Sequence, residues 1–443
     1  MSEKKLSTGK FARLGFQHMF AMFGATILVP ILTGLSTSAT LLFAGLGTLL
    51  FHLITGRKVP AFLGSSFAFL GGYAAVRTLV EDSNAASGAA LNWVPYAGIG
   101  VACAGLLYVV VSMLFRAFGA NKVMRFFPPI VTGPIIICIG ITLANSAINN
   151  CANNWWIALV AVVVVIVCNI WGKGMIKIIP ILLGVVASYA VAAITGQVDF
   201  TAVKEAAWIG LPFKMEDTAF SLFGGADGSL IVSALVAMVP IAIATMMEHI
   251  GDMCAISSTV GKNFVEEPGL HRTLLGDGCA TTLAALFGAP ANTTYGENTG
   301  VLALTGVYNP AVVRMAAVLA IVFSFCPKFA ALIGCMPAAT IGGVSLILYG
   351  MISAVGVRNV VENQVDFTKS RNVIIAALIM SLSLGIAFSA AGAIAFTIGG
   401  VTVSLSGLAV ASLVGILLNA ILPGNDYEFG KNKQGDESVN FEV

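Results

Sequence analysis

The sequence predicts an all-α polytopic membrane protein with fourteen transmembrane segments, arranged as a 7+7 inverted repeat in which short extended segments interrupt spans three and ten. Composition is the first observation behind this prediction. The chain has 443 residues, of which 58% are hydrophobic and 10% charged, and its mean hydropathy is +0.93. Soluble domains carry about 25% charged residues. The formal net charge is only +2, so neither a soluble enzyme nor a nucleic-acid-binding protein is expected.

The spans follow from the thickness of a bilayer. Its hydrocarbon core is about 30 Å thick, so each transmembrane helix needs roughly 20 apolar residues. Runs of that length place the fourteen spans near residues 15–33, 38–55, 61–79, 96–117, 128–148, 155–171, 178–195, 227–250, 273–289, 294–308, 311–333, 336–356, 372–392 and 402–422. Spans three and ten are poor helices, because residues 64–66 (GSS) and 293–296 (TTYG) favour turns or extended backbone.

Basic residues indicate the orientation, because Lys and Arg accumulate in cytoplasmic loops. With the N-terminus inside, nineteen of the 23 basic residues fall on the cytoplasmic side, and the other side receives only Arg77, Lys204, Lys214 and Lys328. Both termini are therefore predicted to be cytoplasmic. No cleavable leader is expected, because the basic opening leads into a full-length span without an obvious cleavage site.

An internal repeat divides the chain. Residues 127–133 (FPPIVTG) and 336–342 (MPAATIG) share a proline and a glycine at the same spacing and open spans five and twelve. The interrupted spans are also seven apart, and this odd offset gives the halves opposite orientation, as in many secondary transporters. The predicted parts are a cytoplasmic N-terminus (1–14), a first repeat (15–195), an extracytoplasmic loop (196–226), a second repeat (227–422) and a cytoplasmic tail (423–443).

Few ionisable side chains lie inside the predicted spans, and they mark a candidate site. Glu248 and Asp252 share one helix face, and Glu297 follows the second interruption. A carboxyl group that gains and loses a proton as a cavity opens can couple transport to a proton gradient. Structural alternatives stay open: a buried pair for Glu248 and Glu297, a polar helix end for Asp252, and a satisfied buried histidine for His18. His249 is interpreted as structural, because it points about 100° away from Glu248.

Four motifs resemble the nucleobase-ascorbate transporter family, and in particular its bacterial uracil-transporting branch. They are residues 16–26 (FQHMFAMFGAT), 63–69 (LGSSFAF), 248–251 (EHIG) and 292–301 (NTTYGENTGV). The stretch from Glu297 to Thr305 is similar to the family signature Glu-Asn-x-Gly-x-x-x-x-Thr. The motifs occur in the family's order, and the resemblance runs nearly from end to end. It implies a location in the bacterial plasma membrane.

The resemblance implies a core domain (spans 1–4 and 8–11) that moves against a gate domain (spans 5–7 and 12–14), with a homodimer formed through the gate domain. It also implies that the carboxyl groups of Glu248 and Glu297 bind a nucleobase and that the backbone amides of Phe67 and Gly296 bind its carbonyl groups. Uracil offers two N–H donors and two C=O acceptors, which this set can satisfy. The aromatic rings of Phe67 and Tyr295 are expected to cover the base.

Asp252, His18 and Asn298 are expected to support the site or the proton coupling. Asp252 resembles the xanthine-transporting branch, whereas Glu297 resembles the uracil branch at a position that should touch the base. The predicted function is therefore proton-coupled uracil import, with a xanthine or urate permease as the alternative. A remote alternative is an anion exchanger of similar fold, which would need fixed positive charge at the membrane midplane.

Neither an enzymatic activity nor a resident cofactor is expected. The loops carry no nucleophile and base pair, no P-loop and no metal-ligand spacing. The predicted partners are the small-molecule substrate, the coupling proton and membrane lipid, with no nucleic acid and no metal.

Overall fold

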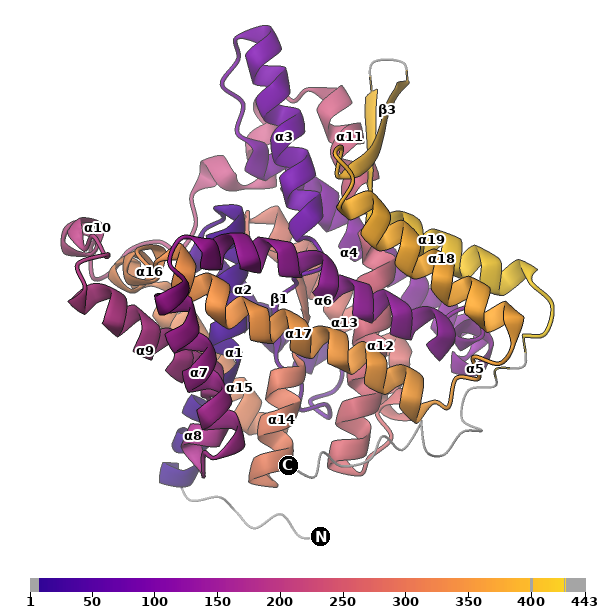
Figure 1. Cartoon of the computed structure of the whole chain (residues 1–443), viewed down its shortest axis with the longest axis horizontal. Coiled ribbons are helices and arrows are strands. Elements are labelled where there is room, and N and C mark those ends of the chain that lie inside the picture. Colours follow the sequence, from indigo (N-terminus) through magenta and orange to yellow (C-terminus); the bar gives the residue numbers. More distant parts are fainter. Residues whose placement is uncertain (1–7, 399–400, 426, 428–443) are drawn as a thin grey trace.

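The computed structural model describes residues 8–398, 401–425 and 427, apart from the side chains at positions 8, 10, 297, 300, 304 and 401. The described chain is almost entirely helical, and the helices cross around a buried centre formed by α1, α2, α12 and α13 (Figure 1). Two small antiparallel sheets interrupt this helical arrangement.

The first half of the chain has nine helices and one strand among the described residues. They are α1 (Thr8–Thr33), α2 (Thr37–Ile54), β1 (Leu63–Ser65), α3 (Leu70–Ser87), α4 (Trp93–Phe118), α5 (Ala120–Met124), α6 (Pro129–Ala152), α7 (Trp155–Ile170), α8 (Met175–Ile178) and α9 (Pro180–Ile194). The connection to the second half contains α10 (Thr201–Glu205) and the 3-10 turns η1 (Met215–Asp217) and η2 (Ala219–Gly224).

The second half begins with a long helical segment divided at Pro240. Its elements are α11 (Gly228–Met238), α12 (Ile241–Val260), the π-turn η3 (Val265–Gly269), α13 (Leu270–Leu286), β2 (Asn292–Thr294), α14 (Gly296–Thr305), α15 (Pro310–Ser324), α16 (Pro327–Gly334), α17 (Ala338–Glu362), α18 (Ser370–Ala387), β3 (Ala393–Ile398), β4 (Val401–Ser406) and α19 (Gly407–Ile421).

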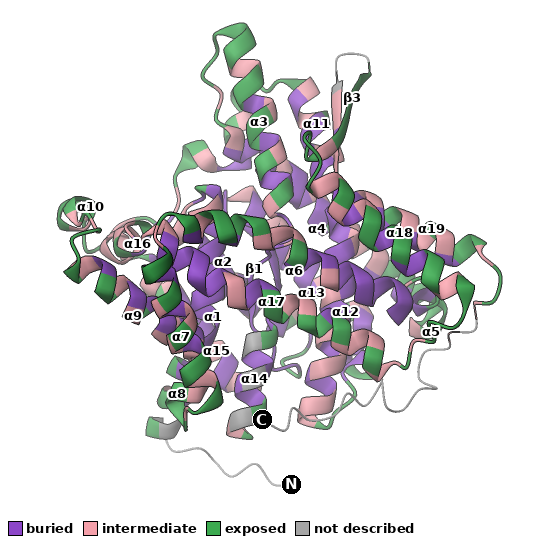
Figure 2. Cartoon of the chain, in the orientation of Figure 1, coloured by how far each residue is buried: buried purple, intermediate pink, exposed green. Residues whose placement is uncertain are grey.

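Several helices are built to lie in a bilayer. Within the described ranges, seven helical segments are long and apolar enough to span a membrane, and α15 with α16 makes an eighth if the bent pair is one span. Helices α7, α9 and α19 are apolar but shorter. Many large apolar side chains on α7 and α18 face outward, as the green stretches of Figure 2 show. The protein is therefore an integral membrane protein with several apolar spans.

Several predicted spans have different boundaries in the structure. Residues 311–333 are not one straight span, because α15 and α16 meet at an angle of 88°. The cause is local: Pro327 cannot donate a backbone hydrogen bond and begins a new helix at its first position. The span predicted to end at residue 250 continues through α12 to Val260, so Asp252 lies well inside a helix.

The start of the last span was also predicted wrongly. Residues 401–406, whose sequence VTVSLS alternates apolar and hydroxyl-bearing side chains, form β4 and pair with β3. Helix α19 begins only at Gly407, where the Ser406 hydroxyl accepts a hydrogen bond from the Ala409 N–H. The resulting hairpin projects beside α11 (Figure 1), and β4 packs against that helix.

The closest helix pair is α6 with α17. Glycines allow the two backbones to touch: a Cβ atom on Gly140 would lie 2.2 Å from the Tyr349 carbonyl oxygen, and one on Gly356 would lie 2.5 Å from the Ile137 nitrogen. The glycines of the two repeated motifs, Gly133 and Gly342, make equivalent close approaches at opposite ends of this antiparallel pair.

Candidate substrate-binding site

Two short strands, β1 and β2, meet at the centre of the molecule, and we call this pair the strand crossing. β1 and β2 pair antiparallel with Gly64 opposite Thr293, and the Tyr295 N–H extends the pairing by donating to the Phe62 carbonyl at 3.1 Å. Each strand leads directly into a helix, β1 into α3 and β2 into α14. The first turn of a helix has N–H groups without an intrahelical acceptor. The predicted interruptions therefore bring polar backbone to the middle of the fold.

Tyr295 fixes this crossing. Its hydroxyl donates to the Ser65 carbonyl oxygen at 2.9 Å and lies 3.1 Å from the Ser65 hydroxyl. The Ser65 hydroxyl in turn donates to the Thr26 carbonyl oxygen at 3.0 Å. Gly64 leaves room for the ring, because a Cβ atom there would lie 2.4 Å from Cε2 of Tyr295. Tyr295 is buried, and its hydroxyl serves the strand crossing.

A cavity of about 840 Å³ borders the strand crossing. Of the sequence-predicted residues, five line it: Phe67, Glu248, Asp252, Tyr295 and Gly296. The volume is in the range of small-molecule sites, which are mostly apolar with a few convergent polar groups. Four of the five residues predicted to bind substrate, Phe67, Glu248, Tyr295 and Gly296, are thus brought together beside the start of α14.

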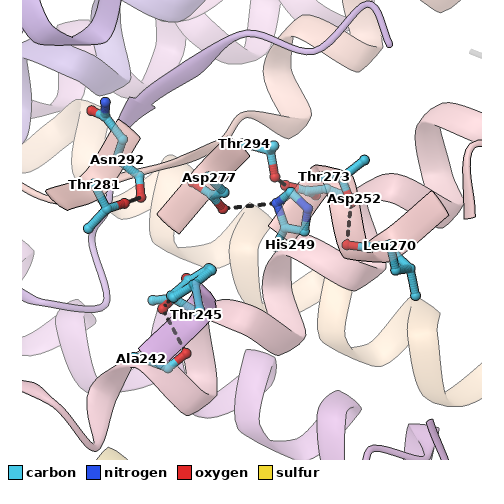
Figure 3. A network of polar contacts seen from close by, with 11 residues as sticks. Ala242, Thr245, His249, Asp252, Leu270, Thr273, Asp277, Thr281, Asn292 and Thr294 are labelled. Carbon is cyan, nitrogen blue, oxygen red and sulfur yellow. Dashed lines mark hydrogen bonds and ion pairs between the residues drawn. The ribbon is translucent and has the colours of Figure 1, made fainter. Parts of the chain in front are cut away.

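Asp252 is connected to the second strand. The Thr294 hydroxyl donates to Oδ2 of Asp252 at 2.6 Å, and the two side chains meet in Figure 3. Gly296 is close by, because a Cβ atom built on it would lie 3.9 Å from Oδ1 of Asp252. Asp252 therefore ties α12 to the segment that leads into α14. This contact argues against the alternative that Asp252 is merely a polar residue at the end of a helix.

Glu248 lies one helical turn before Asp252 and faces the same cavity, where it is half-buried. Glu297 is the second residue of α14. Its backbone begins next to the cavity-lining Gly296, but its side chain lies outside the described part of the structure. The pairing of the two carboxyl groups predicted from the sequence therefore stays a prediction.

Phe67 connects the cavity to a second group of helices. Its ring packs edge-on against Tyr349 of α17, with 5.6 Å between the ring centroids. Both rings are buried, and edge-to-face contacts of this kind stabilise aromatic pairs. The strand crossing therefore contacts α17 directly through Phe67.

His18 and Asn298 are brought together away from the cavity lining. The Asn298 side-chain amide donates to the His18 carbonyl oxygen at 3.3 Å and lies 3.3 Å from Nδ1 of the His18 ring. Both residues are buried. This contact joins α1 to α14, which is a supporting position of the kind predicted for both residues.

A second buried polar contact was missed by the sequence reasoning. Nδ1 of His249 lies 2.9 Å from Oδ2 of Asp277 on α13, and both side chains are fully buried. Figure 3 shows the two side chains pointing at one another. The sequence signal for this contact was Asp277 itself, an acidic residue between two glycines inside an apolar span. An acidic side chain is costly there without a partner. The interpretation of His249 as structural agrees with this pairing.

The fold is similar to that of two membrane proteins of known structure. The structure is similar to the transmembrane domain of the cyanobacterial bicarbonate transporter BicA, with a TM-score of 0.59, 16% identity and coverage of 93% of this chain and 96% of that chain. It is also similar to SLC26A9, with a TM-score of 0.62, 12% identity and coverage of 93% and 64%. At these identities the likeness shows the fold alone.

Sequence comparison is more specific. The profile of the xanthine/uracil permeases, described as "Permease family", matches residues 9–392. The uracil permease of Bacillus caldolyticus is 42% identical over 429 residues, covering 94% of this chain and 93% of the relative. The uracil permease of Bacillus subtilis (strain 168) is 38% identical over 460 residues, covering 99% of both. That of Escherichia coli (strain K12) is 35% identical over 419 residues, covering 92% and 90%. The chain belongs to the xanthine/uracil permease family and is a permease, not an enzyme.

Proposed function

We propose that this protein imports uracil together with protons across the bacterial plasma membrane. The observation that carries the proposal is the cavity beside the strand crossing, which is lined by Glu248 and by the start of α14. The relatives named uracil permeases match nearly the whole chain, so the likeness includes every element around that cavity.

Recognition of the base follows from donors and acceptors. An ionised Glu248 accepts hydrogen bonds and suits an N–H group of uracil. Backbone N–H groups at Phe67 and Gly296, each next to the start of a helix, suit its carbonyl oxygens. Glu297 is proposed as the acceptor for the second N–H group. The Phe67 ring, held by Tyr349, is positioned to cover one face of the base.

Proton coupling is assigned to the carboxyl groups of the cavity. Glu248 is half-buried and in reach of both substrate and water, so its protonation can change as the cavity opens and closes. Asp252 is proposed to support the coupling, because its hydrogen bond to Thr294 links α12 to the segment before Gly296. His18 and Asn298 are proposed to hold α14 against α1.

We infer that the fold is a fourteen-span inverted repeat. The support is that contacts between helices of one half recur between their counterparts, when each span is matched to the span seven positions away. α4 packs against α13 as α15 packs against α2, and α7 packs against α17 as α18 packs against α6. α1–α4 with α11–α16 form the proposed core domain, and α6–α9 with α17–α19 form the gate domain. α6 and α17, which open with the repeated motifs, pack against one another.

The proposed orientation has both termini in the cytoplasm. In that orientation, Lys177 and Arg358, which line the far part of the cavity, lie near the cytoplasmic side, and the cavity faces inward. A homodimer through the gate domain is also proposed. α18 is the least buried of the helices long enough to span a membrane within the described ranges, and it offers an apolar face for a second copy.

The charges of the cavity favour a neutral base over an anion. Glu248 and Asp252 lie nearest the strand crossing, and two carboxyl groups would repel an anionic substrate. Two cations, Lys177 and Arg358, also line the cavity, and Arg358 forms an ion pair with Glu362. An anion exchanger is therefore disfavoured although the fold is shared. A xanthine or urate permease stays the alternative, because Asp252 resembles that branch.

The test is uptake of labelled uracil in a bacterial host that lacks its own uracil permease. Accumulation is expected to stop when the proton gradient is collapsed. Glu248→Gln should lower uptake about 10- to 150-fold, because a hydrogen bond to a charged group contributes about 1.5–3 kcal/mol. The matched control is Glu81→Gln on the exposed end of α3, where the carboxylate pairs with Arg77.

Three results would contradict the proposal. Full uptake by the Glu248→Gln variant would remove the carboxyl group from the mechanism. Stronger inhibition of uracil uptake by unlabelled xanthine than by unlabelled uracil would show that xanthine is the preferred substrate. Dependence of accumulation on sodium instead of protons would show that sodium is the coupling ion. Insertion of each variant is checked by its amount in the membrane fraction.

A further inference from the structure

A second, smaller cavity lies at the ends of three helices, away from the strand crossing. Its volume is about 470 Å³, and it is lined by Ile54 at the end of α2, by Ser112, Met113 and Arg116 near the end of α4, and by His271, Arg272 and Leu275 at the start of α13. The Ser112 hydroxyl donates to the His271 carbonyl oxygen and so holds α4 against α13 at the floor of the cavity. We call it the basic pocket.

The basic pocket concentrates positive charge. His271 lies within electrostatic range of both Arg272 and Arg116. Among the residues that the structure describes, no carboxylate oxygen lies within 4.0 Å of either guanidinium group. Both arginines are exposed. Two guanidinium groups held beside one cavity favour an anionic ligand with several acceptor oxygens, such as a phosphate group.

The surface next to the basic pocket is apolar. On α4, Leu106, Val110 and Met113 are all exposed and follow the i, i+4, i+7 spacing of one helix face. Met113, which is 62% exposed, both lines the pocket and belongs to this stripe. Leu53, on the neighbouring α2, is 64% exposed. In a membrane protein, such a stripe faces the acyl chains of the lipids.

We propose that the basic pocket binds the headgroup of an anionic phospholipid, whose acyl chains lie along the exposed stripe of α4. The pocket supplies the cations, and the stripe leads from it along the helix that contributes Arg116. A free phosphate ion would have no use for the apolar surface, whereas a phospholipid uses both. The proposed orientation puts these helix ends at the cytoplasmic leaflet, where basic clusters bind acidic lipids.

This site is separate from the proposed substrate cavity, and its occupation can be measured without transport. Each basic side chain near an anionic headgroup strengthens binding by about fivefold. The two arginines together are therefore expected to favour phosphatidylglycerol over phosphatidylcholine by about 25-fold. The matched control is Lys122 on α5, which is exposed, basic and near the end of α4 but does not line the pocket.

The experiment measures lipids that stay bound to the purified full-length protein from mixed micelles of phosphatidylglycerol and phosphatidylcholine, by native mass spectrometry. Arg116→Gln with Arg272→Gln should lower the preference for phosphatidylglycerol about 25-fold, and each single variant about fivefold. Arg116→Lys with Arg272→Lys should keep most of it, and Lys122→Gln should change it less than twofold. Thermal unfolding checks that each variant is folded.

Two results would overturn the proposal. One is an unchanged preference for phosphatidylglycerol in the double glutamine variant, or an equal loss in Lys122→Gln. The other is displacement of the bound lipid by millimolar glycerol phosphate, because a soluble headgroup without acyl chains would then suffice and the apolar stripe would play no part. If the double variant does not fold, the two single variants decide between the same outcomes.

Discussion

Gly64→Ala is the sharpest perturbation of the strand crossing, because it adds one methyl group at the point of closest approach. The new Cβ atom would lie 2.4 Å from Cε2, 2.5 Å from Cζ and 2.8 Å from the hydroxyl oxygen of Tyr295. Neither partner can move easily: the Tyr295 hydroxyl is bonded to Ser65, and Gly64 is paired with Thr293. Overpacking of this kind costs about 1–3 kcal/mol.

The expected consequence is a displaced crossing and a weaker substrate site. A cost of about 1–3 kcal/mol corresponds to a loss of about 5- to 150-fold in uracil affinity if it is paid in the bound state. Binding is measured by isothermal titration of the detergent-purified protein, and folding by thermal unfolding. Gly71→Ala is the matched control, because nothing lies within 4 Å of a Cβ atom at that position.

A second substitution separates crowding from other causes. Replacing Tyr295 by Ala in the Gly64→Ala protein removes the ring that the new methyl group meets. The double variant should therefore bind uracil no worse than Tyr295→Ala alone, which makes the two effects non-additive. The reasoning is refuted if Gly64→Ala binds uracil as well as Gly71→Ala does, or if the two substitutions simply add.

Two further predictions concern stability. His249→Ala and Asp277→Ala should each destabilise the protein by about 3 kcal/mol, because each leaves a buried partner without its contact, and the double variant should cost less than their sum in an unfolding assay; additive losses would show that the contact is not energetically coupled. Asp227, outside the membrane, caps α11 by accepting from the Ser229 and Leu230 N–H groups, and its hydrogen bonds to the Ser229 hydroxyl and N–H hold its pKa below the ordinary value. A lowered folded pKa gives stability that is present above the unfolded pKa of about 3.9 and is lost as the pH falls through the folded pKa. Asp227→Ala should therefore lower the unfolding temperature at pH 7, by a cap energy of about 1 kcal/mol, and have a smaller effect at pH 3 than at pH 7. An equal loss at both pH values would contradict this assignment.

The sequence predicted the parts of the fold that depend on local backbone chemistry. Gly64 and Thr293 belong to segments that favour extended backbone, and both are in the central sheet. Hydropathy also located most helices, because an apolar run of sufficient length has few alternatives in a membrane. The same signal could not separate helix from strand at residues 401–406, since an apolar alternating segment satisfies both. The bend at Pro327 depends on a single proline inside an otherwise apolar run, which hydropathy alone does not distinguish from a continuous helix.

The candidate site was predicted less completely. Glu248 and Asp252 share a face because helix periodicity is visible in the sequence, and both line the cavity. The partner of Asp252 is Thr294, which lies 42 residues away and is fixed only by the tertiary crossing of α12 and β2. Asp277 was missed for the same reason: its partner His249 is on another helix. Periodicity within one element carries no information about which element lies opposite.

The contact between α6 and α17 limits which surfaces of the protein can slide. Where a backbone carbonyl contacts a glycine, as at Gly140 and Tyr349, no side chains separate the two helices. The two helices therefore form one rigid unit. The neighbouring boundary with α12 is different, because the isoleucines of α6 meet Met247 and Ala244 there across a layer of side chains. Such a layer can exchange rotamers as one surface passes another. If helices move relative to one another during transport, we therefore expect the displacement at the boundary between α6 and α12 and not between α6 and α17.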